Sequence, residues 1–209
     1  MSSVDNIDDR SYSGDMITAD AKERILRSGS AIIHLKGYNG TGIKEITDAA
    51  GIPKGSFYNY FKSKEHFAIE ALDFIGKENF KRINSVLGDK NLPPFERLKR
   101  LFAEMIKPYI EKNNFNQGCF IGNMCQEMAD VNTAISDKVD YIFRSYIAAI
   151  ALCLREAQEN GDIRADRDAD KLAEFIFNSW EGALLRMKAS RNPQPLNAFM
   201  EVLTEVLLR

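Results

Sequence analysis

Apolar residues recur at helical spacing along nearly the whole chain, and this pattern restricts the fold more than any other feature. The clearest run stands three and four residues apart: Phe95, Leu98, Leu101, Phe102, Met105, Ile106 and Tyr109. Sustained apolar/polar alternation, which is typical of strands, is absent. Asn39-Gly40 could form a hairpin turn, but the pattern on both sides of it has helical spacing. We therefore expect an all-α fold of about nine helices.

Glycine, proline and asparagine turns separate the expected helices. The helices are expected at roughly residues 18–36, 43–50, 54–61, 64–87, 95–109, 119–129, 133–160, 168–190 and 195–209. The first should pack through one broad apolar face made of Ala21, Ile25, Leu26, Ala31, Ile32 and Leu35. Ser63 should cap the fourth helix, and Gly161 should close the seventh.

Composition excludes several classes of protein. With 44% hydrophobic and 28% charged residues among 209, the chain is typical of a soluble globular protein with a real core. No apolar run could span a membrane, and the acidic N-terminus lacks a secretion signal, so a cytoplasmic protein is expected. The 3 cysteines lack metal-ligand spacing and form no disulfide framework. We expect neither a metal nor a cofactor.

Charge is unevenly distributed along the chain. Residues 1–16 carry four Asp and one Arg, a net charge of −3, whereas residues 17–70 carry eight Lys or Arg against six Asp or Glu, a net charge of +2. The expected domains are therefore a disordered acidic tail at 1–16, a basic domain at 17–66 and a helical domain at 67–209.

The stretch 54–61 places aromatic and polar residues on two faces of a helix. At about 100° per residue, Phe57 and Phe61 share the core face. Small, hydroxyl, amide and tyrosine side chains cover the other face, and lysines flank it. Such a surface suits nucleic acid, since hydroxyls and lysines bond phosphates and an amide can read a base edge. The alternative is an ordinary solvated face.

Two short helices joined by Gly51-Ile52-Pro53 form a helix-turn-helix, whose second helix enters the major groove of DNA. Over residues 20–75 the chain resembles the TetR/AcrR family of transcriptional repressors. The matching residues are Ile46, Gly51, Lys54, Gly55, Ser56, Tyr58, Phe61, Lys62, Ser63, Lys64 and Glu65.

The resemblance implies a homodimer that binds a palindromic operator in double-stranded DNA and releases it when a small molecule enters the C-terminal ligand-binding and dimerisation domain. By position, the residues implied to contact DNA are Thr41, Lys44, Lys54, Gly55, Ser56, Tyr58, Asn59, Tyr60 and Lys64. Gly42 stands where the family often has a hydroxyl residue, and Thr41 is expected to substitute for it.

The last two expected helices carry narrow apolar stripes. The family resemblance implies that they form a four-helix bundle across a two-fold axis. The implied interface residues are Leu172, Phe175, Ile176, Ala183, Leu196, Phe199, Leu203 and Val206. The alternative is that the stripes pack within one chain.

Bulky, adaptable side chains on the middle helices are candidates for an effector pocket, with ordinary core packing as the alternative. They are Met105, Tyr109, Cys119, Phe120, Met124, Met128, Phe143, Tyr146, Phe177 and Trp180. Cys119 follows Gly118 at an expected helix start, where free amides should lower its pKa, and Lys188 could be a cationic neighbour. We therefore consider Cys119 either an electrophile sensor or a small core residue.

Two other functional classes remain open. One is a helical small-molecule-binding protein without DNA binding. The other is an enzyme, which the sequence disfavours because it has 2 histidines and no recognisable catalytic motif.

Overall fold

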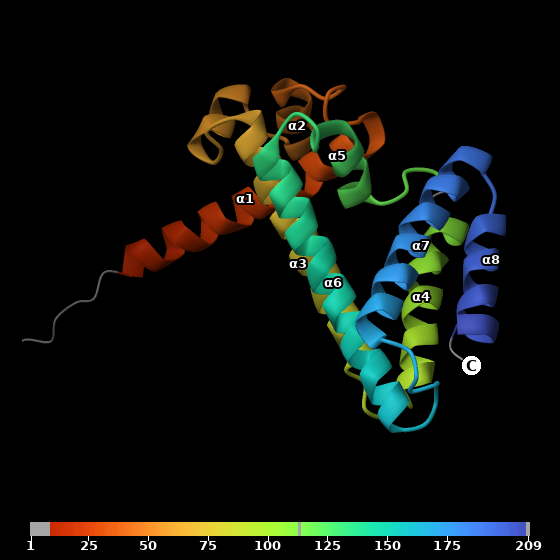
Figure 1. The fold of residues 1–209 in the computed structure, drawn as a ribbon. Helices are drawn as coiled ribbons and strands as arrows, with labels where there is room; N and C mark the ends of the chain where they lie inside the picture. Colours follow the sequence, from red (N-terminus) through yellow and green to blue (C-terminus); the bar gives the residue numbers. More distant parts are fainter. Residues whose placement is uncertain (1–8, 113, 208–209) are drawn as a thin grey trace, which may run out of the picture. The chain divides into compact units, whose positions relative to one another are not determined.

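The computed structural model describes residues 9–112 and 114–207, and the surroundings of side chains within 20–112 and 114–205. These residues form eight α-helices, one 3₁₀-helix and one π-turn (Figure 1). No strand occurs among them, which confirms the predicted all-α fold. The elements are α1 (Asp9–Lys36), α2 (Ile43–Ala50), η1 (Lys54–Asn59), α3 (Lys64–Leu87), α4 (Pro94–Glu111), α5 (Phe120–Met128), α6 (Thr133–Glu159), α7 (Ala169–Ser190), α8 (Gln194–Val202) and η2 (Leu203–Leu207).

The chain divides into two compact units, one ending at Ala71 and one beginning at Leu72, so the boundary falls inside α3. The sequence placed it at residue 66. No helix among the described residues is long and apolar enough to cross a membrane.

Three phenylalanines form the core of the first unit. Phe57, Phe61 and Phe67 are fully buried, and their ring centroids lie 5.0–5.9 Å apart. The hydroxyl of Ser63 accepts a hydrogen bond from the amide of His66 at 3.0 Å, which confirms the expected cap of α3. The cap fixes the start of the helix that carries Phe67 into the core.

The start and packing face of α1 both differ from the expectation. The helix begins at Asp9, so residues 9–16 of the expected tail are helical, whereas residues 1–8 lie outside the described part of the chain. Ala31 is exposed and Leu35 is 64% exposed, so the broad face was wrong at these positions. Ile25, Leu26 and Ile33 are buried, so the buried face of α1 is narrower than expected.

Gly29 lets α1 approach the core closely. A Cβ atom there would lie 2.6 Å from Phe67 Cζ and 2.8 Å from Ile46 Cγ2, both of which belong to fully buried side chains. We therefore expect Gly29→Ala to lower the free energy of unfolding by about 1–3 kcal/mol, despite the higher helix propensity of alanine. Gly182 on α7 is the matched control, since nothing lies within 4 Å of its added Cβ. Gly182→Ala should stabilise the chain by roughly 0.5–1 kcal/mol, as measured by urea unfolding in a Phe175→Glu, Val202→Glu background that is expected to be monomeric. Equal effects at the two positions would contradict the packing described here.

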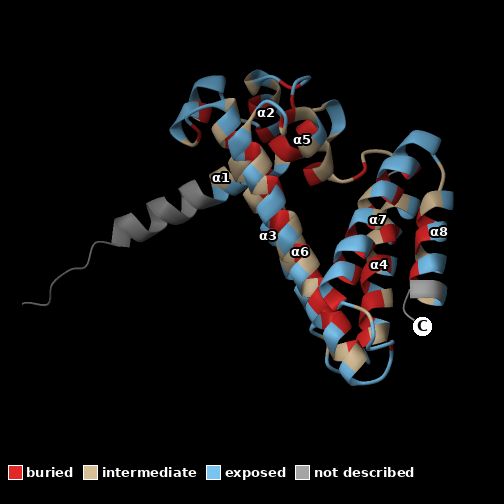
Figure 2. Ribbon diagram, in the orientation of Figure 1, coloured by how far each residue is buried: buried red, intermediate tan, exposed pale blue. Residues whose placement is uncertain are grey.

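The second unit is a helical bundle whose helices each carry both buried and exposed residues (Figure 2), and the buried ones are mostly apolar. Helix α6 packs against α4, α5 and α7, and α8 packs against α7 and α4. Trp180 of α7 is 1% exposed, and its ring lies 5.6 Å from Phe102 of α4 and 5.5 Å from Phe199 of α8. This aromatic cluster joins the three helices.

Candidate nucleic-acid interface and regulatory site

A tight turn connects α2 to η1. Gly51 adopts a left-handed conformation with φ 66°, and the amides of Gly51 and Ile52 bond back to the carbonyls of Asp48 and Thr47 at 3.1 and 3.0 Å. Pro53 then starts η1, with its carbonyl accepting the amide of Ser56 at 2.9 Å. The turn therefore fixes the direction in which η1 leaves α2.

The second helix of this motif is a 3₁₀-helix, not the α-helix that the sequence predicted over residues 54–61. It is only 6 residues long and contains Gly55, a poor helix former, so a short i→i+3 pattern replaces the α-helical ladder. Its end closes with an α-type bond from the Phe61 amide to the Phe57 carbonyl at 3.0 Å. Phe57 and Phe61 therefore still share the buried face, as predicted.

The other face of η1 is accessible. Lys54, Gly55 and Asn59 are exposed, and Tyr58 is 56% exposed. Nothing lies within 4 Å of a Cβ added at Gly55, so a DNA backbone can approach there. Ser56 and Tyr60 are half-buried at the edge of this surface. We call the surface formed by Lys54, Gly55, Tyr58 and Asn59 the η1 face.

Lysines around the η1 face differ in their surroundings. Lys44 is paired with Asp48 at 2.6 Å, and this hydrogen bond raises its pKa. The ammonium of Lys64 donates to the Tyr38 carbonyl and lies 4.0 Å above the Tyr38 ring. The exposed ammonium groups of Lys54 and Lys62 have no partner within the described part of the chain. Lys62 was missing from the predicted contact set, although the Lys-Ser-Lys repeat could have indicated it.

Thr41, one of the expected DNA contacts, is buried. Its side chain is 1% exposed, and its hydroxyl donates to the Gly37 carbonyl at 2.7 Å. The hydroxyl therefore holds the loop after α1 instead of facing solvent. At the start of α2, the carboxylate of Glu45 accepts both the Gly42 amide and the Lys36 ammonium.

In the second unit, the stripes on α7 and α8 only partly agree with the expected interface. Leu172, Ile176, Leu196 and Leu203 are at most 8% exposed and belong to the core of their own chain, as in the alternative of packing within one chain. Phe175 is 55% exposed. Val206 lies outside the residues whose side chains are described.

An open groove of about 530 Å³ lies between α7 and α8. Phe175, Ala183 and Phe199 from the predicted stripe line it. Ser179 and Arg186 follow Phe175 at helical spacing on α7 and also line the groove. Val202 of α8, which is 45% exposed, lines it as well and was not among the predicted interface residues. We call this surface the α7–α8 groove.

Most of the expected effector-pocket residues are buried. Phe120, Met124, Met128, Tyr146, Phe177 and Trp180 are buried, whereas Met105, Tyr109, Cys119 and Phe143 are half-buried. The Phe177 ring lies 5.1 Å from Phe143 and 6.1 Å from Tyr146. The Tyr146 hydroxyl donates to the Gly76 carbonyl at 3.0 Å. These contacts join α3, α6 and α7.

Cys119 caps α5, as its position suggested, but its pKa moves in the opposite direction to the expected one. Its sulfur accepts the Gly122 amide at 3.3 Å, and this bond alone would lower the pKa. Burial and the neighbouring Glu181 carboxyl outweigh it, so the pKa of the thiol is raised well above its usual value. Lys188 is not the charged neighbour, because its ammonium donates to Asn123 Oδ1 at 3.2 Å.

The Glu181 carboxyl makes the stability of the second unit depend on pH. Burial raises its pKa from 4.5 to about 7, so the folded state binds more protons than the unfolded state between these values. Stability therefore falls as pH rises through this window, by about 3 kcal/mol at most. We expect Glu181→Gln to remove this dependence in urea unfolding at pH 5 and pH 8. Both proteins contain the two histidines, so their contribution cancels when the free energies of unfolding of variant and wild type are subtracted. If the free energy of unfolding changes equally with pH in both proteins, the raised pKa of Glu181 is contradicted.

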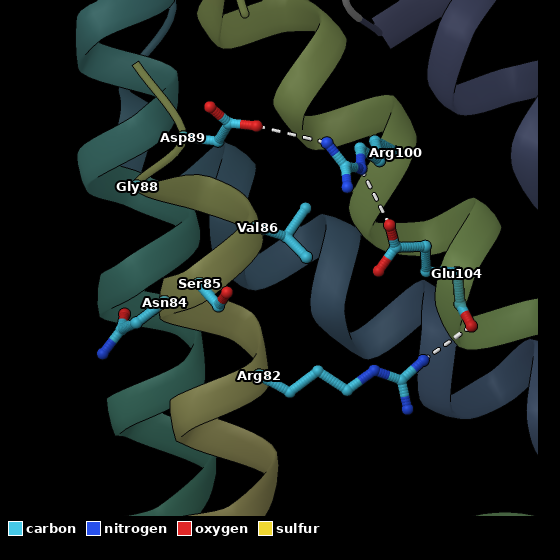
Figure 3. Close-up of a pocket in the computed structure, with 8 residues that line it drawn as sticks. All are labelled: Arg82, Asn84, Ser85, Val86, Gly88, Asp89, Arg100 and Glu104. Carbon is cyan, nitrogen blue, oxygen red and sulfur yellow. Dashed lines mark hydrogen bonds and ion pairs between the residues drawn. The ribbon is translucent and has the colours of Figure 1, made fainter. Parts of the chain in front are cut away.

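A polar hollow of about 590 Å³ lies where α3 ends beside α4 (Figure 3). Arg100 pairs with Asp89 at 3.2 Å and with Glu104 at 2.7 Å, and Arg82 donates to the Glu104 carbonyl at 2.6 Å. Both acidic side chains of the hollow are thus paired with Arg100. The bond from Arg82 to Glu104 joins α3 to α4.

The fold and the η1 face define a helix-turn-helix DNA-binding unit joined to a helical second unit. Residues 25–71 match the family described as bacterial regulatory proteins, tetR family, and residues 94–203 match the tetracyclin repressor-like C-terminal domain. The chain belongs to the TetR family and is a helix-turn-helix transcriptional regulator, as the sequence predicted.

Similar proteins cover nearly the whole chain. The HTH-type transcriptional repressor DhaR of Mycobacterium sp. is 37% identical over 193 residues, 92% of this chain and 95% of that protein. The transcriptional regulator AcuR of Cereibacter sphaeroides is 35% identical over 179 residues, 86% of this chain and 81% of that protein. The crystal structure of a regulatory protein TetR from Rhodobacter sphaeroides is 32% identical with a TM-score of 0.83, and the match covers 88% of this chain and 97% of that one.

Proposed function

We propose that this protein is a homodimeric transcriptional repressor that binds a palindromic operator in the cytoplasm and releases it when a small-molecule effector binds the second unit. The observation that carries the proposal is the η1 face, a polar, accessible surface held on a fully buried phenylalanine core. The repressor DhaR, at 37% identity, supports the same direction of regulation. Such a role needs no catalytic turnover.

Within the η1 face, Asn59 is the proposed reader of a base edge, because an exposed amide can donate to and accept from one base. Tyr58, Lys54 and Lys62 are proposed to bond phosphates. The ammonium groups of Lys44 and Lys64 already have a partner within the protein, so each could contact a phosphate only in addition to that partner or in its place. Ser56 and Tyr60 border the same surface.

The α7–α8 groove is the proposed dimer interface. It is apolar, with Phe175 and Val202 exposed in the single chain. Gly182 adds no side chain on α7, so a second helix could approach closely. A two-fold axis through this groove would bring two α7 and two α8 helices together. Such a dimer would carry two η1 faces, one for each half of a palindromic operator.

The effector is proposed to act on the second unit through the half-buried side chains Met105, Tyr109, Cys119 and Phe143. Cys119 makes an electron-poor small molecule the favoured class, because a thiol is the strongest nucleophile among these groups. An uncharged organic ligand without covalent reaction is the second candidate, favoured by the apolar surroundings of Phe143 and Phe177.

Release of DNA tests this proposal directly. The protein is bound to a labelled operator duplex, treated with acrylamide, and followed by fluorescence anisotropy. The expected result is a fall to the value of free duplex, which Cys119→Ser should abolish while leaving operator binding intact. Release that is unchanged in Cys119→Ser would exclude the covalent effector and leave the non-covalent one.

A further inference from the structure

Two groups, one from each of two helices, contact the sulfur of Cys119. The Gly122 amide of α5 donates to it at 3.3 Å, and the thiol donates to the Glu181 carboxylate of α7. A Cβ atom added to Gly122 would lie 2.7 Å from Glu181 Oε2 and 3.8 Å from the sulfur. The carboxylate and the sulfur therefore approach the same point, and only a glycine leaves them room.

We infer that Glu181 is the general base of a covalent effector site, taking the proton of Cys119 as its sulfur adds to an electron-poor alkene. The inference rests on the proposed function, because it specifies how the electrophilic effector reacts. It assigns to Glu181 a role that nothing in the sequence pattern indicated.

The reaction balances without an oxidant or a metal. The S–H bond breaks and its proton moves to the Glu181 carboxylate, while the sulfur forms a bond to the β-carbon of the alkene. The π electrons of the alkene move onto the adjoining carbonyl as an enolate. Glu181 returns the proton to the α-carbon, which gives a thioether and restores the carboxylate. The Gly122 amide stabilises charge on the sulfur during the first step.

A base is needed because the free thiolate is scarce. Burial and Glu181 raise the pKa of the thiol well above its usual value, so unassisted ionisation is rare at neutral pH. The pKa of Glu181 is about 7, which suits a group that must accept and return a proton near neutral pH.

The other ionisable groups around the thiol are poorer bases. Tyr109 of α4 donates to the Gly118 carbonyl at 3.1 Å, and burial raises its pKa far above neutrality. Tyr146 of α6 donates to the Gly76 carbonyl and has a similarly raised pKa. Lys188 donates to Asn123, and Arg82 of α3 acts on Tyr109 only through its charge. Glu181 is the group in hydrogen-bond contact with the sulfur.

The test compares the alkylation rates of wild type and Glu181→Gln with acrylamide, followed by peptide mass spectrometry between pH 6 and pH 8.5. Glutamine keeps the shape of the side chain but cannot accept the proton. Cys119 should react at least about 10-fold more slowly in the variant at pH 7.5. The wild-type rate should follow a pKa near 7, and this inflection should disappear in the variant.

The sign of the effect separates a base from a mere neighbour. If Glu181 acts only through its negative charge, its removal lowers the pKa of Cys119 and makes alkylation faster. An equal or faster rate at Cys119 would therefore overturn the inference. Cys125 is the internal control. Its pKa is raised mainly by burial, then by Asp130, and least by Glu181. The alkylation rate of Cys125 should therefore stay equal or rise slightly in Glu181→Gln.

Far-UV circular dichroism shows whether the variant is folded, and Glu181→Asp provides a second variant that retains a carboxylate and should recover part of the rate. The release assay is read separately. If Cys119 reacts through Glu181 but the alkylated protein still holds its operator duplex, the inference stands and the covalent effector proposal fails.

Discussion

Glutamate at both Phe175 and Val202 is expected to separate the proposed dimer and abolish tight operator binding. Both side chains are exposed in the single chain, so the monomer should keep its fold. In the dimer, the two-fold axis would bury four added carboxylates in the α7–α8 groove, without partners. The dimer dissociation constant should rise by about 1000-fold or more, equivalent to roughly 4 kcal/mol, as measured by sedimentation velocity.

The matched control adds two glutamates outside the α7–α8 groove. Leu152→Glu with Val131→Glu changes two exposed aliphatic residues outside the groove, at 57% and 76% exposure. This double variant should sediment as wild type and bind operator normally. If the groove variant remains a dimer at the same protein concentrations, the interface lies on another surface.

Removing the two most distinctive side chains of the η1 face should reduce operator affinity by about 100-fold or more. Tyr58→Ala with Asn59→Ala deletes a proposed phosphate contact and a proposed base contact from each half-site, and a good base contact contributes about 1–3 kcal/mol. Phe57 beneath them is fully buried and unchanged, so the free energy of unfolding should hardly move. Fluorescence anisotropy on an operator duplex measures the affinity.

A control double variant and two single variants separate the effects of base and phosphate contacts from a general loss of binding. Tyr141→Ala with Asn84→Ala removes an exposed tyrosine and an exposed asparagine from the second unit and should leave affinity unchanged. Asn59→Ala alone should relax specificity at one base position. Lys54→Ala should weaken all duplexes alike and reduce the salt dependence of binding. Wild-type affinity in the double variant would remove the η1 face from the DNA interface.

The sequence predicted the helices because their periodicity is local, but it could not predict which side of each helix a neighbour would cover. The stripe of Leu172, Ile176, Leu196 and Leu203 has the same spacing whether it faces its own chain or a second one, and the structure buries it in its own chain. Leu35 was assigned to the core of α1 for the same reason, yet it is 64% exposed.

Electrostatic features were the least predictable, because they depend on residues distant in sequence. The helix start around Cys119 suggested a lowered pKa, but Glu181, on a different helix, together with burial, raises it. Thr41 stood at the expected position for a phosphate contact, but its hydroxyl is bonded to Gly37. The turn at Gly51 and the η1 face were predictable, since the glycine, the proline and the buried Phe57 and Phe61 lie within one short segment.

The most direct measurement of the central claim is selection of duplexes from a random-sequence library by the purified wild-type protein, with a mock selection as control. It requires no assumption about where the operator lies. Enrichment of a palindrome with half-sites about one or more helical turns apart would show a dimeric reader of DNA sequence. Failure to enrich any sequence above the mock selection, by a folded protein, would contradict the account.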